Sequence, residues 1–266
     1  MWVEKLRDLS PIENELLFRK RNKQRGVDTA LVDVDGTICD TRRVFGFHIA
    51  ECAKYLEGQG GLSSEEWVEE IRAESDKLYK THKVNPNRWN FGIENLAEAH
   101  DIRRQERGEV LDILRRIYET PIPYLPGAEE GLEFLKRTGL PIRLVTHAGH
   151  AWTRKKIEWL ELGRFIDPEN DVWTIDVNGD KTAEGWMKGI IYFGVRPREC
   201  MAIGDGPGPD ILSAYDCGVE NLFLVRREIE LWAIHKRRTP DITRQIKSLV
   251  DLTYLGQEIM YGRTDK

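Results

Sequence analysis

The sequence lacks the marks of several protein classes. No apolar run approaches the roughly 20 residues that a membrane span needs, and the N-terminus is amphipathic and charged, unlike a signal peptide. Basic residues are not in excess either, since 40 Lys and Arg stand against 45 Asp and Glu. The net charge of -5 gives no electrostatic footprint for nucleic acid or an anionic membrane. We therefore expect a cytoplasmic protein that acts on a small molecule, and its oligomeric state stays open.

Cysteine is scarce in this sequence. The four cysteines are Cys39, Cys52, Cys200 and Cys217, and no two of them form a CxxC pair. This spacing favours reduced thiols over a disulfide framework or a zinc site. Internal repeats and low-complexity tracts are absent too. The 266 residues, 40% of them hydrophobic, suffice for one large domain or two.

Short apolar runs that alternate with helical patterns are present. Such runs, each ending near polar or glycine residues, predict strands at 28–35, 141–146, 171–176, 199–204 and 221–225. Helical patterns separate them, which is typical of βαβ units. We expect an α/β fold with a doubly wound, mostly parallel sheet.

A long insertion interrupts this alternation after the first strand. Roughly a hundred residues lie before the second strand, where a simple crossover needs a few tens. The insertion shows several helical stripes and no convincing strand. We expect it to form a cap over the carboxyl ends of the strands, where open α/β sheets bind ligands. The expected division is an N-terminal helical extension at 1–27, a core at 28–39 and 126–266, and a helical cap domain at 40–125.

Two aspartates follow the first apolar run directly, in Asp33-Val34-Asp35-Gly36-Thr37. Side chains alternate along a strand, so Asp33 and Asp35 are expected to project to the same face. Two carboxylates this close resist ionising together unless a cation such as Mg²⁺ joins them. One could attack phosphorus while the other transfers protons. A strand that simply ends in an Asp-Gly turn is the alternative.

Three further motifs follow in order along the chain. Thr146 ends the second predicted strand, where its hydroxyl could donate to a phosphate oxygen. Lys181 is expected to open a helix after Asn178-Gly179-Asp180, and an ammonium beside a helix N-terminus suits an anion. A later strand delivers Asp205, and Asp210 opens or caps the next helix. Each motif alone is compatible with ordinary loop structure.

Taken together, these residues resemble the haloacid dehalogenase superfamily of phosphohydrolases over about residues 28 to 225. The family pattern is DxDGT, a strand ending in Thr or Ser, a Lys, and GD followed shortly by Asp. The phrase Tyr124-Leu125-Pro126-Gly127-Ala128 is similar to the helical-cap branch, which includes phosphoglycolate phosphatase-like and beta-phosphoglucomutase-like proteins. The resemblance also implies the strand order 3-2-1-4-5.

The resemblance implies a role for each motif residue. Asp33 would be the nucleophile that becomes an aspartyl phosphate, and Asp35 the acid and base. Mg²⁺ would bind the Asp33 carboxylate, the Asp35 carbonyl and Asp205. Asp210, counted with this metal set, would help to hold the loop. The phosphoryl oxygens would be bound by Thr146 and Lys181.

Two positions depart from the family pattern, and the cap is expected to set specificity. His147 stands where many relatives have Asn, and Thr182 where a Pro often follows the Lys. We include His147 among the substrate-binding candidates with Thr146 and Lys181, although a locally satisfied loop histidine is the alternative. Basic and aromatic residues of the insertion could hold an anionic or planar leaving group, or simply form a solvated surface. They are Arg42, Arg43, His48, His82, Lys83, Arg88 and Trp89.

The sequence thus predicts a Mg²⁺-dependent phosphatase that hydrolyses a small phosphomonoester through an aspartyl-phosphate intermediate. A phosphomutase of the same branch is the nearest alternative, because it shares the motifs. A non-catalytic phosphate-ligand binder on the same fold is a third. A 2-haloacid dehalogenase is disfavoured because that chemistry needs neither Asp35 nor a metal.

Overall fold

The computed structural model describes residues 10–226 and 239–254, and it contains one parallel sheet of six strands. The order is β3-β2-β1-β4-β5-β6, so the chain winds in both directions from β1 as expected. The strands are β1 (Thr29–Val32), β2 (Ile142–Thr146), β3 (Val172–Thr174), β4 (Cys200–Gly204), β5 (Asn221–Val225) and β6 (Arg244–Ile246).

Two strand predictions need correction. The run predicted at 28–35 is a strand only over Thr29–Val32, so Asp33 and Asp35 lie beyond its end. The amide of Asp33 still donates to Ile203 O at 2.9 Å, but the chain then turns at Gly36, which has a φ of 86°. Strand β6 was not expected, because three residues with one buried side chain give no apolar pattern.

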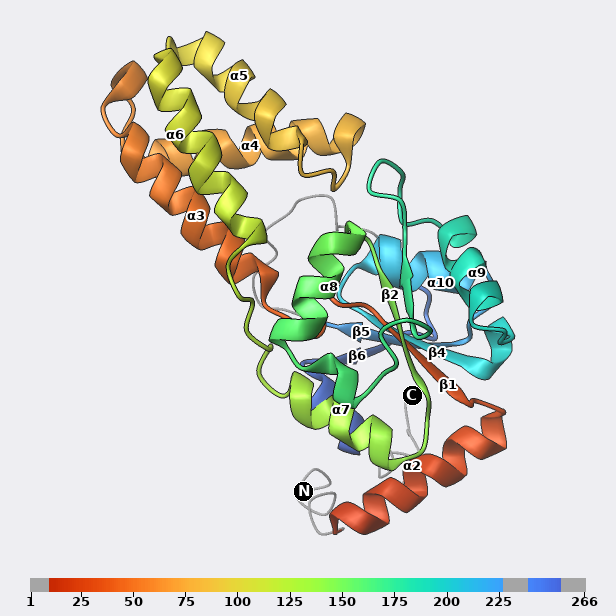
Figure 1. Ribbon diagram of the computed structural model, residues 1–266. Helices are drawn as coiled ribbons and strands as arrows, with labels where there is room; N and C mark the ends of the chain where they lie inside the picture. Colours follow the sequence, from red (N-terminus) through yellow and green to blue (C-terminus); the bar gives the residue numbers. More distant parts are fainter. Residues whose placement is uncertain (1–9, 227–238, 255–266) are drawn as a thin grey trace.

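The strands bury both faces, as parallel sheets do. Alternate residues of β1 and its neighbours belong to two separate apolar clusters. Val32, with Leu144, packs in the cluster that contains helix α7 (Ala128–Arg137) and helix α8 (His150–Trp159). Leu31 and its equivalents pack in the cluster that contains α9 (Ala183–Tyr192) and α10 (Ser213–Asp216), which Figure 1 shows on the opposite side of the sheet.

Four long helices of the insertion form a separate lobe, which projects from the sheet in Figure 1. Each has an apolar stripe and packs mainly against two of the others, α3 and α5 each contacting both α4 and α6. They are α3 (Thr41–Leu56), α4 (Ser64–His82), α5 (Arg88–His100) and α6 (Arg104–Arg115). This is the expected helical cap, while the exact borders at 40 and 125 stay predictions.

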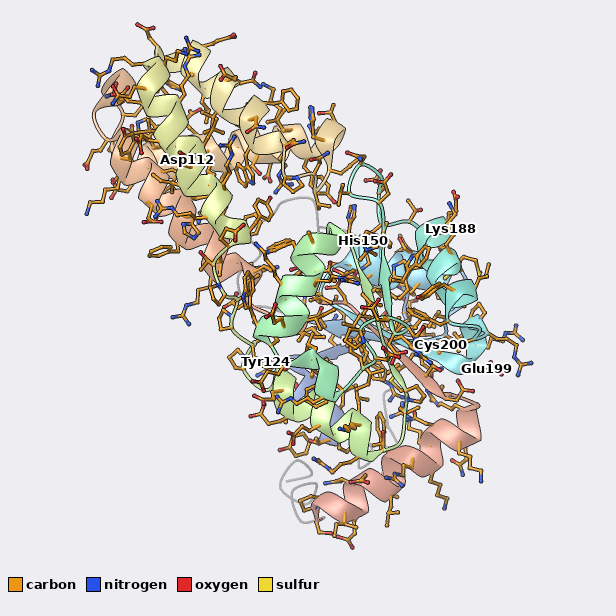
Figure 2. All side chains as sticks on the ribbon, in the orientation of Figure 1. Asp112, Tyr124, His150, Lys188, Glu199 and Cys200 are labelled. Atoms are coloured by element: carbon orange, nitrogen blue, oxygen red, sulfur yellow. The ribbon has the colours of Figure 1, made fainter. Side chains whose placement is uncertain are left out.

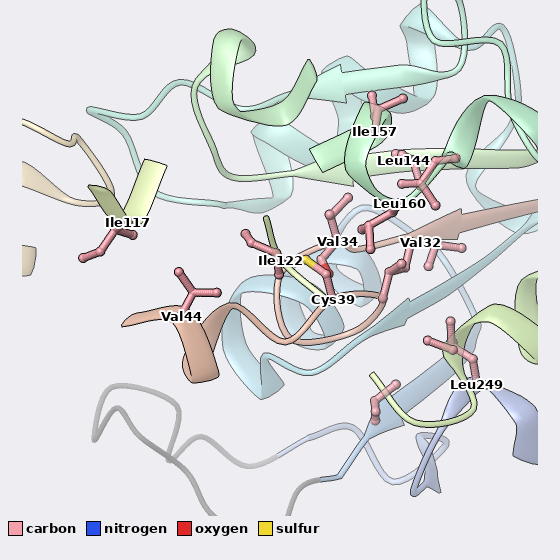
Figure 3. Packing of buried hydrophobic residues seen from close by; sticks show 14 of the residues in the cluster. Val32, Val34, Cys39, Val44, Ile117, Ile122, Leu144, Ile157, Leu160 and Leu249 are labelled. Carbon is pink, nitrogen blue, oxygen red and sulfur yellow. The ribbon is translucent and has the colours of Figure 1, made fainter. Parts of the chain in front are cut away.

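The root of the cap shares its core with the sheet. Figure 3 shows the buried side chains of Val34, Cys39 and Ile122 close together, between β1 and the lobe. Val44 and Ile117 continue this cluster into the first and last segments of the cap. The amide of Asp40 donates to Pro123 O at 2.9 Å, so the outgoing and returning segments are bonded to each other. The cap is therefore anchored beside the end of β1.

The N-terminal extension contains helix α2 (Pro11–Arg25). Ser10 caps it with a capping box to Glu13, and Gly26 ends it in the left-handed region. Its Phe18 ring packs edge-on against Phe134 of α7, with centroids 5.0 Å apart. The part of the expected extension at 1–9 lies outside the described residues. No helix in residues 10–226 and 239–254 is long and apolar enough to cross a membrane.

Candidate active site

The aspartates of the first and fourth motifs meet at the reversal point of the sheet. Strands β1 and β4 are direct neighbours, and Asp33 and Asp205 each follow the last residue of one of them. One cavity between the core and the cap is lined by both residues, by Asp35 and Asp210, and by Lys181. Five predicted site residues from three distant segments therefore surround one space.

Lys181 is the centre of a buried charge cluster. Its Nζ lies 2.6 Å from Asp33 Oδ1 and 2.6 Å from Asp210 Oδ1, and it donates to Val145 O at 2.8 Å. Lys181 and Asp33 are each 5% exposed. Helix α9 begins at Ala183, and Thr182 caps it by accepting from Gly185 N, so Lys181 precedes the helix. Thr182, at the position where the family often has Pro, can therefore start the helix as its N-cap.

Burial and charge act against each other in this cluster. Burial raises the pKa of the Asp33 carboxyl well above its ordinary value; Asp210 adds to this, and Lys181 opposes it. Burial lowers the pKa of Lys181, but the carboxylates of Asp210 and Asp33 outweigh it and leave the pKa raised. Lys181 is the firmly charged member, because its ammonium bonds two carboxylates. Ionised Asp33 therefore needs further positive charge nearby.

The acidic groups fit a divalent cation. Carboxylate oxygens of Asp33, Asp205 and Asp210 lie within 4.8 Å of one another. Both oxygens of Asp210 already accept bonds, from Lys181 and from the amide of Gly206, so Asp210 holds the loop as expected. A Cβ on Gly36 would overlap the Asp205 carboxylate, so only glycine leaves room there. Hard oxygen donors of this kind suit Mg²⁺.

Thr146 and His147 end strand β2 at the same edge of the sheet. Thr146 is fully buried, and its Oγ1 has no hydrogen-bond partner among the described residues. It is not one of the residues that line the cavity. His147 lines the cavity, and its Nε2 lies 3.1 Å from Asp176 O, to which it can donate. Burial and then Lys181 lower the pKa of His147, which favours the neutral ring.

A model of the haloacid dehalogenase-like hydrolase family matches residues 27–218. The chain belongs to this family. No curated protein matches the sequence. The family assignment agrees with the expected resemblance and with the α/β core and helical cap.

Solved structures of the family share the fold at low identity. An HAD phosphatase from Thermococcus onnurineus is 22% identical, with a TM-score of 0.57 over 85% of this chain and 96% of that one. A 2-haloacid dehalogenase from Pseudomonas syringae pv. Tomato is 18% identical (TM-score 0.55; 85% and 96%). The HAD-hydrolase YfnB from Bacillus subtilis, bound to magnesium, is 16% identical (TM-score 0.64; 86% and 98%). These likenesses show the fold alone.

One buried lysine of this HAD-like hydrolase was not expected. Lys156 on α8 is fully buried, and its Nζ lies 2.6 Å from Asp35 Oδ2. The ammonium also lies 4.1 Å from the ring centre of Trp152, one helical turn earlier. Because Asp35 lines the cavity while Lys156 does not, the lysine holds the carboxylate from behind. In the sequence, Lys156 ends a basic triplet that is typical of a solvated surface.

The structure separates the cap candidates. Arg42 and Arg88 line the cavity, and Arg42 Nη2 lies 3.3 Å from Asp205 Oδ2. The other candidates are not among the lining residues. His48 is buried between Glu51 and Thr120. Arg43 is exposed, and Lys83 pairs with Asp180. His82 Nδ1 lies 2.8 Å from Thr81 Oγ1. Trp89 donates to Tyr118.

Proposed function

We propose that this HAD-like hydrolase is a Mg²⁺-dependent phosphatase that hydrolyses a small phosphomonoester through an aspartyl phosphate on Asp33. The supporting observation is that one cavity is lined by two carboxylates with different partners. Asp33 is bonded to Lys181 and buried beside Asp205, whereas Asp35 is bonded to Lys156 and is more exposed. Such an asymmetric pair suits a nucleophile and a separate proton carrier.

The first half of the proposed reaction forms a covalent intermediate. An Asp33 oxygen attacks phosphorus, and the bond from phosphorus to the leaving oxygen breaks. Asp35, in its acid form, gives its proton to that oxygen. The ammonium of Lys181 and the hydroxyl of Thr146 are proposed to bind phosphoryl oxygens. Thr146 does not line the cavity, but its buried Oγ1 has no partner among the described residues, which supports this role. The substrate would be a small phosphorylated metabolite.

The second half releases phosphate. Asp35 takes a proton from water, the water oxygen attacks phosphorus, and the bond to Asp33 breaks to give inorganic phosphate. The carboxylates of Asp33 and Asp205, with the carbonyl of Asp35, are the groups proposed to hold Mg²⁺. When bound, Mg²⁺ supplies charge that offsets the repulsion between Asp33 and the phosphoryl oxygens. The buried free thiols of all four cysteines support a cytoplasmic location.

Phosphate release tests this proposal directly. We expect release from at least one of a panel of sugar phosphates, phosphoglycolate, nucleotides and an aryl phosphate, with Mg²⁺ and not with chelator. Asp33→Asn should lower kcat roughly 10³-fold or more, because no nucleophile remains. Asp112→Asn is the matched control, since its side chain is 71% exposed on the outer cap (Figure 2).

Other products would contradict the proposal. An isomerised phosphosugar without phosphate release would indicate a phosphomutase, and halide release from a 2-haloacid would indicate dehalogenation. Binding of phosphate without turnover of any substrate would indicate a non-catalytic binder. If Asp33→Asn kept wild-type turnover, the nucleophile assignment would be wrong.

A further inference from the structure

The cavity carries hydrogen-bond donors that the protein itself does not satisfy. Ser75 Oγ from α4 and Arg88 Nε from α5 are buried without a partner among the described residues, and so is Trp152 Nε1 from α8. All three residues line the cavity. Ser75 is 3% exposed and Arg88 is 7% exposed. A buried donor without an acceptor is costly, so these positions favour a ligand that brings acceptors.

Aromatic rings form one wall of the same cavity. Phe45, Tyr118 and Trp152 all line it. Their rings contact one another, with centroid separations of 6.0 Å from Phe45 to Trp152 and 5.0 Å from Tyr118 to Trp152. Because the three rings come from α3, the end of the cap and α8, the wall exists only where cap and core meet. Packed rings of this kind favour a flat ring over a flexible or strongly hydrated group.

The guanidinium of Arg88 is held in place by its surroundings. Arg88 donates through Nη1 to Lys83 O at 2.7 Å, and its guanidinium lies 5.2 Å from the Trp89 ring centre. These contacts orient the guanidinium and leave Nε unused. Asp76 also lines the cavity, and its charge acts on Arg88. The cap side is therefore preorganised rather than a loose solvated surface.

We propose that this cap-side subsite binds the leaving group of the substrate, and that the leaving group is an aromatic or heteroaromatic ring with a carboxylate or carbonyl oxygen. The inference rests on the proposed phosphatase function and adds the substrate class. The ring packs against Phe45, Tyr118 and Trp152, and the oxygen accepts from Ser75 and Arg88. A polyol is a poorer match, because its strongly hydrated hydroxyl groups suit the aromatic wall less well than a flat ring does.

A series of phosphomonoesters tests the substrate class. We expect kcat/KM to fall from 4-carboxyphenyl phosphate to phenyl phosphate, and further to glycerol phosphate and glucose 6-phosphate. Ser75→Ala should lower the ratio of the carboxyphenyl to the phenyl value roughly tenfold, since one hydrogen bond to a charged acceptor is lost. The ratio is the readout because both aryl esters need the same catalytic groups.

Stability distinguishes this role from a structural one. Ser75→Ala removes a hydroxyl that has no partner in the described structure, so its Tm should equal or exceed that of the wild type. Ser64→Ala, at the start of the same helix and away from the cavity, should change neither Tm nor the kcat/KM ratio by much. A fall in Tm together with an equal loss for all substrates would overturn the proposal.

Binding of the leaving group separates this inference from the phosphatase assignment. We expect 4-hydroxybenzoate to bind the wild-type protein in calorimetry and to bind Ser75→Ala more weakly. If no monoester released phosphate but this binding difference held, the phosphatase proposal would fail and the subsite would stand. Faster turnover of glucose 6-phosphate than of both aryl esters would overturn the subsite and leave the phosphatase.

Discussion

The two sides of the cavity differ in how their polar groups are satisfied. On the core side, Lys181 Nζ lies 2.6 Å from Asp33 Oδ1 and 2.6 Å from Asp210 Oδ1. On the cap side, Ser75 Oγ and Arg88 Nε find no partner in the part of the chain that the structure describes. A closed network of charges holds its geometry without a ligand, whereas unsatisfied donors gain most when a ligand arrives. We therefore propose that the core side carries out the reaction and that the cap side selects the substrate.

Core polar groups do not all follow this rule. Thr146 Oγ1 is buried without a partner among the described residues, although it lies at the end of β2. It is also the hydroxyl that we propose for phosphoryl binding. Unsatisfied donors thus occur on both sides at positions assigned to the substrate, while the core carboxylates assigned to chemistry are paired.

The largest effect is expected from the centre of the charge cluster. Lys181→Met should lower the free energy of unfolding by about 3–5 kcal/mol, because Asp33 and Asp210 would stay buried without their shared cation. Lys188→Met on α9 is the matched control, since Lys188 is exposed and pairs only with Glu184 at the surface (Figure 2). Urea unfolding followed by circular dichroism measures both variants.

A second variant shows whether uncompensated charge causes the loss. Adding Asp33→Asn to Lys181→Met removes one of the two buried carboxylates, so part of the stability should return. If Lys181→Met destabilised no more than Lys188→Met, the core side would not be a closed charge network. The comparison between the two sides would then lose its basis.

A smaller effect is expected at the second buried lysine. Lys156→Met should lower kcat about 10- to 100-fold, with little change in KM, because Asp35 loses the ammonium that orients it. This is a fraction of what general acid–base catalysis commonly contributes. Steady-state kinetics with the best substrate of the panel measures it.

The neighbouring residue provides the control for Lys156. Lys155→Met instead removes the ion pair with Glu119 and the hydrogen bond to Tyr118 O, and it should leave kcat nearly unchanged. A rise in KM with constant kcat for Lys156→Met would place the lysine in substrate binding. Lys156 would then act like the cap-side groups, and a paired core residue would contribute to substrate binding.

The core side was predictable because its residues occupy strand ends. Asp33, Thr146 and Asp205 each follow or end an apolar run, and parallel strands bring such ends to one edge. Lys156 was not predictable, because its contact with Asp35 spans 121 residues and depends on how α8 packs. A lysine in a basic triplet carries no signal of burial.

The cap side was predicted less well for a related reason. Arg42 and Arg88 were candidates and do line the cavity, but Ser75 was not. Ser75 lies on the apolar stripe of α4 between Ile71 and Leu78, where a serine is compatible with ordinary packing. Its unsatisfied hydroxyl is visible only once α5 and the core are placed around it. Specificity is thus harder to predict than chemistry, since it depends on tertiary contacts without a motif.

The smallest expected effect concerns how independently the two sides open. Cys52 lies in cap helix α3 and Cys200 begins β4, and both are fully buried. Burial is the main cause that raises the pKa of each thiol to about 12. The next contribution comes from Glu51 for Cys52 and from Asp28 for Cys200. Neither forms much thiolate near pH 8 in the folded protein, so labelling by a thiol reagent requires opening. Because Cys200 lies in a strand paired on both sides, we expect Cys52 to label at a lower urea concentration, as read by mass spectrometry of peptides.

Substrate or product should change this difference. The cap contributes Ser75, Arg88 and Phe45 to the cavity, so a ligand that bridges both sides stabilises the lobe more than the sheet. Adding 4-hydroxybenzoate with phosphate should slow labelling of Cys52 more than that of Cys200. Equal protection of both thiols would mean that the cap and the core open as one unit. The two sides would then differ in their chemical roles but not in how readily they unfold.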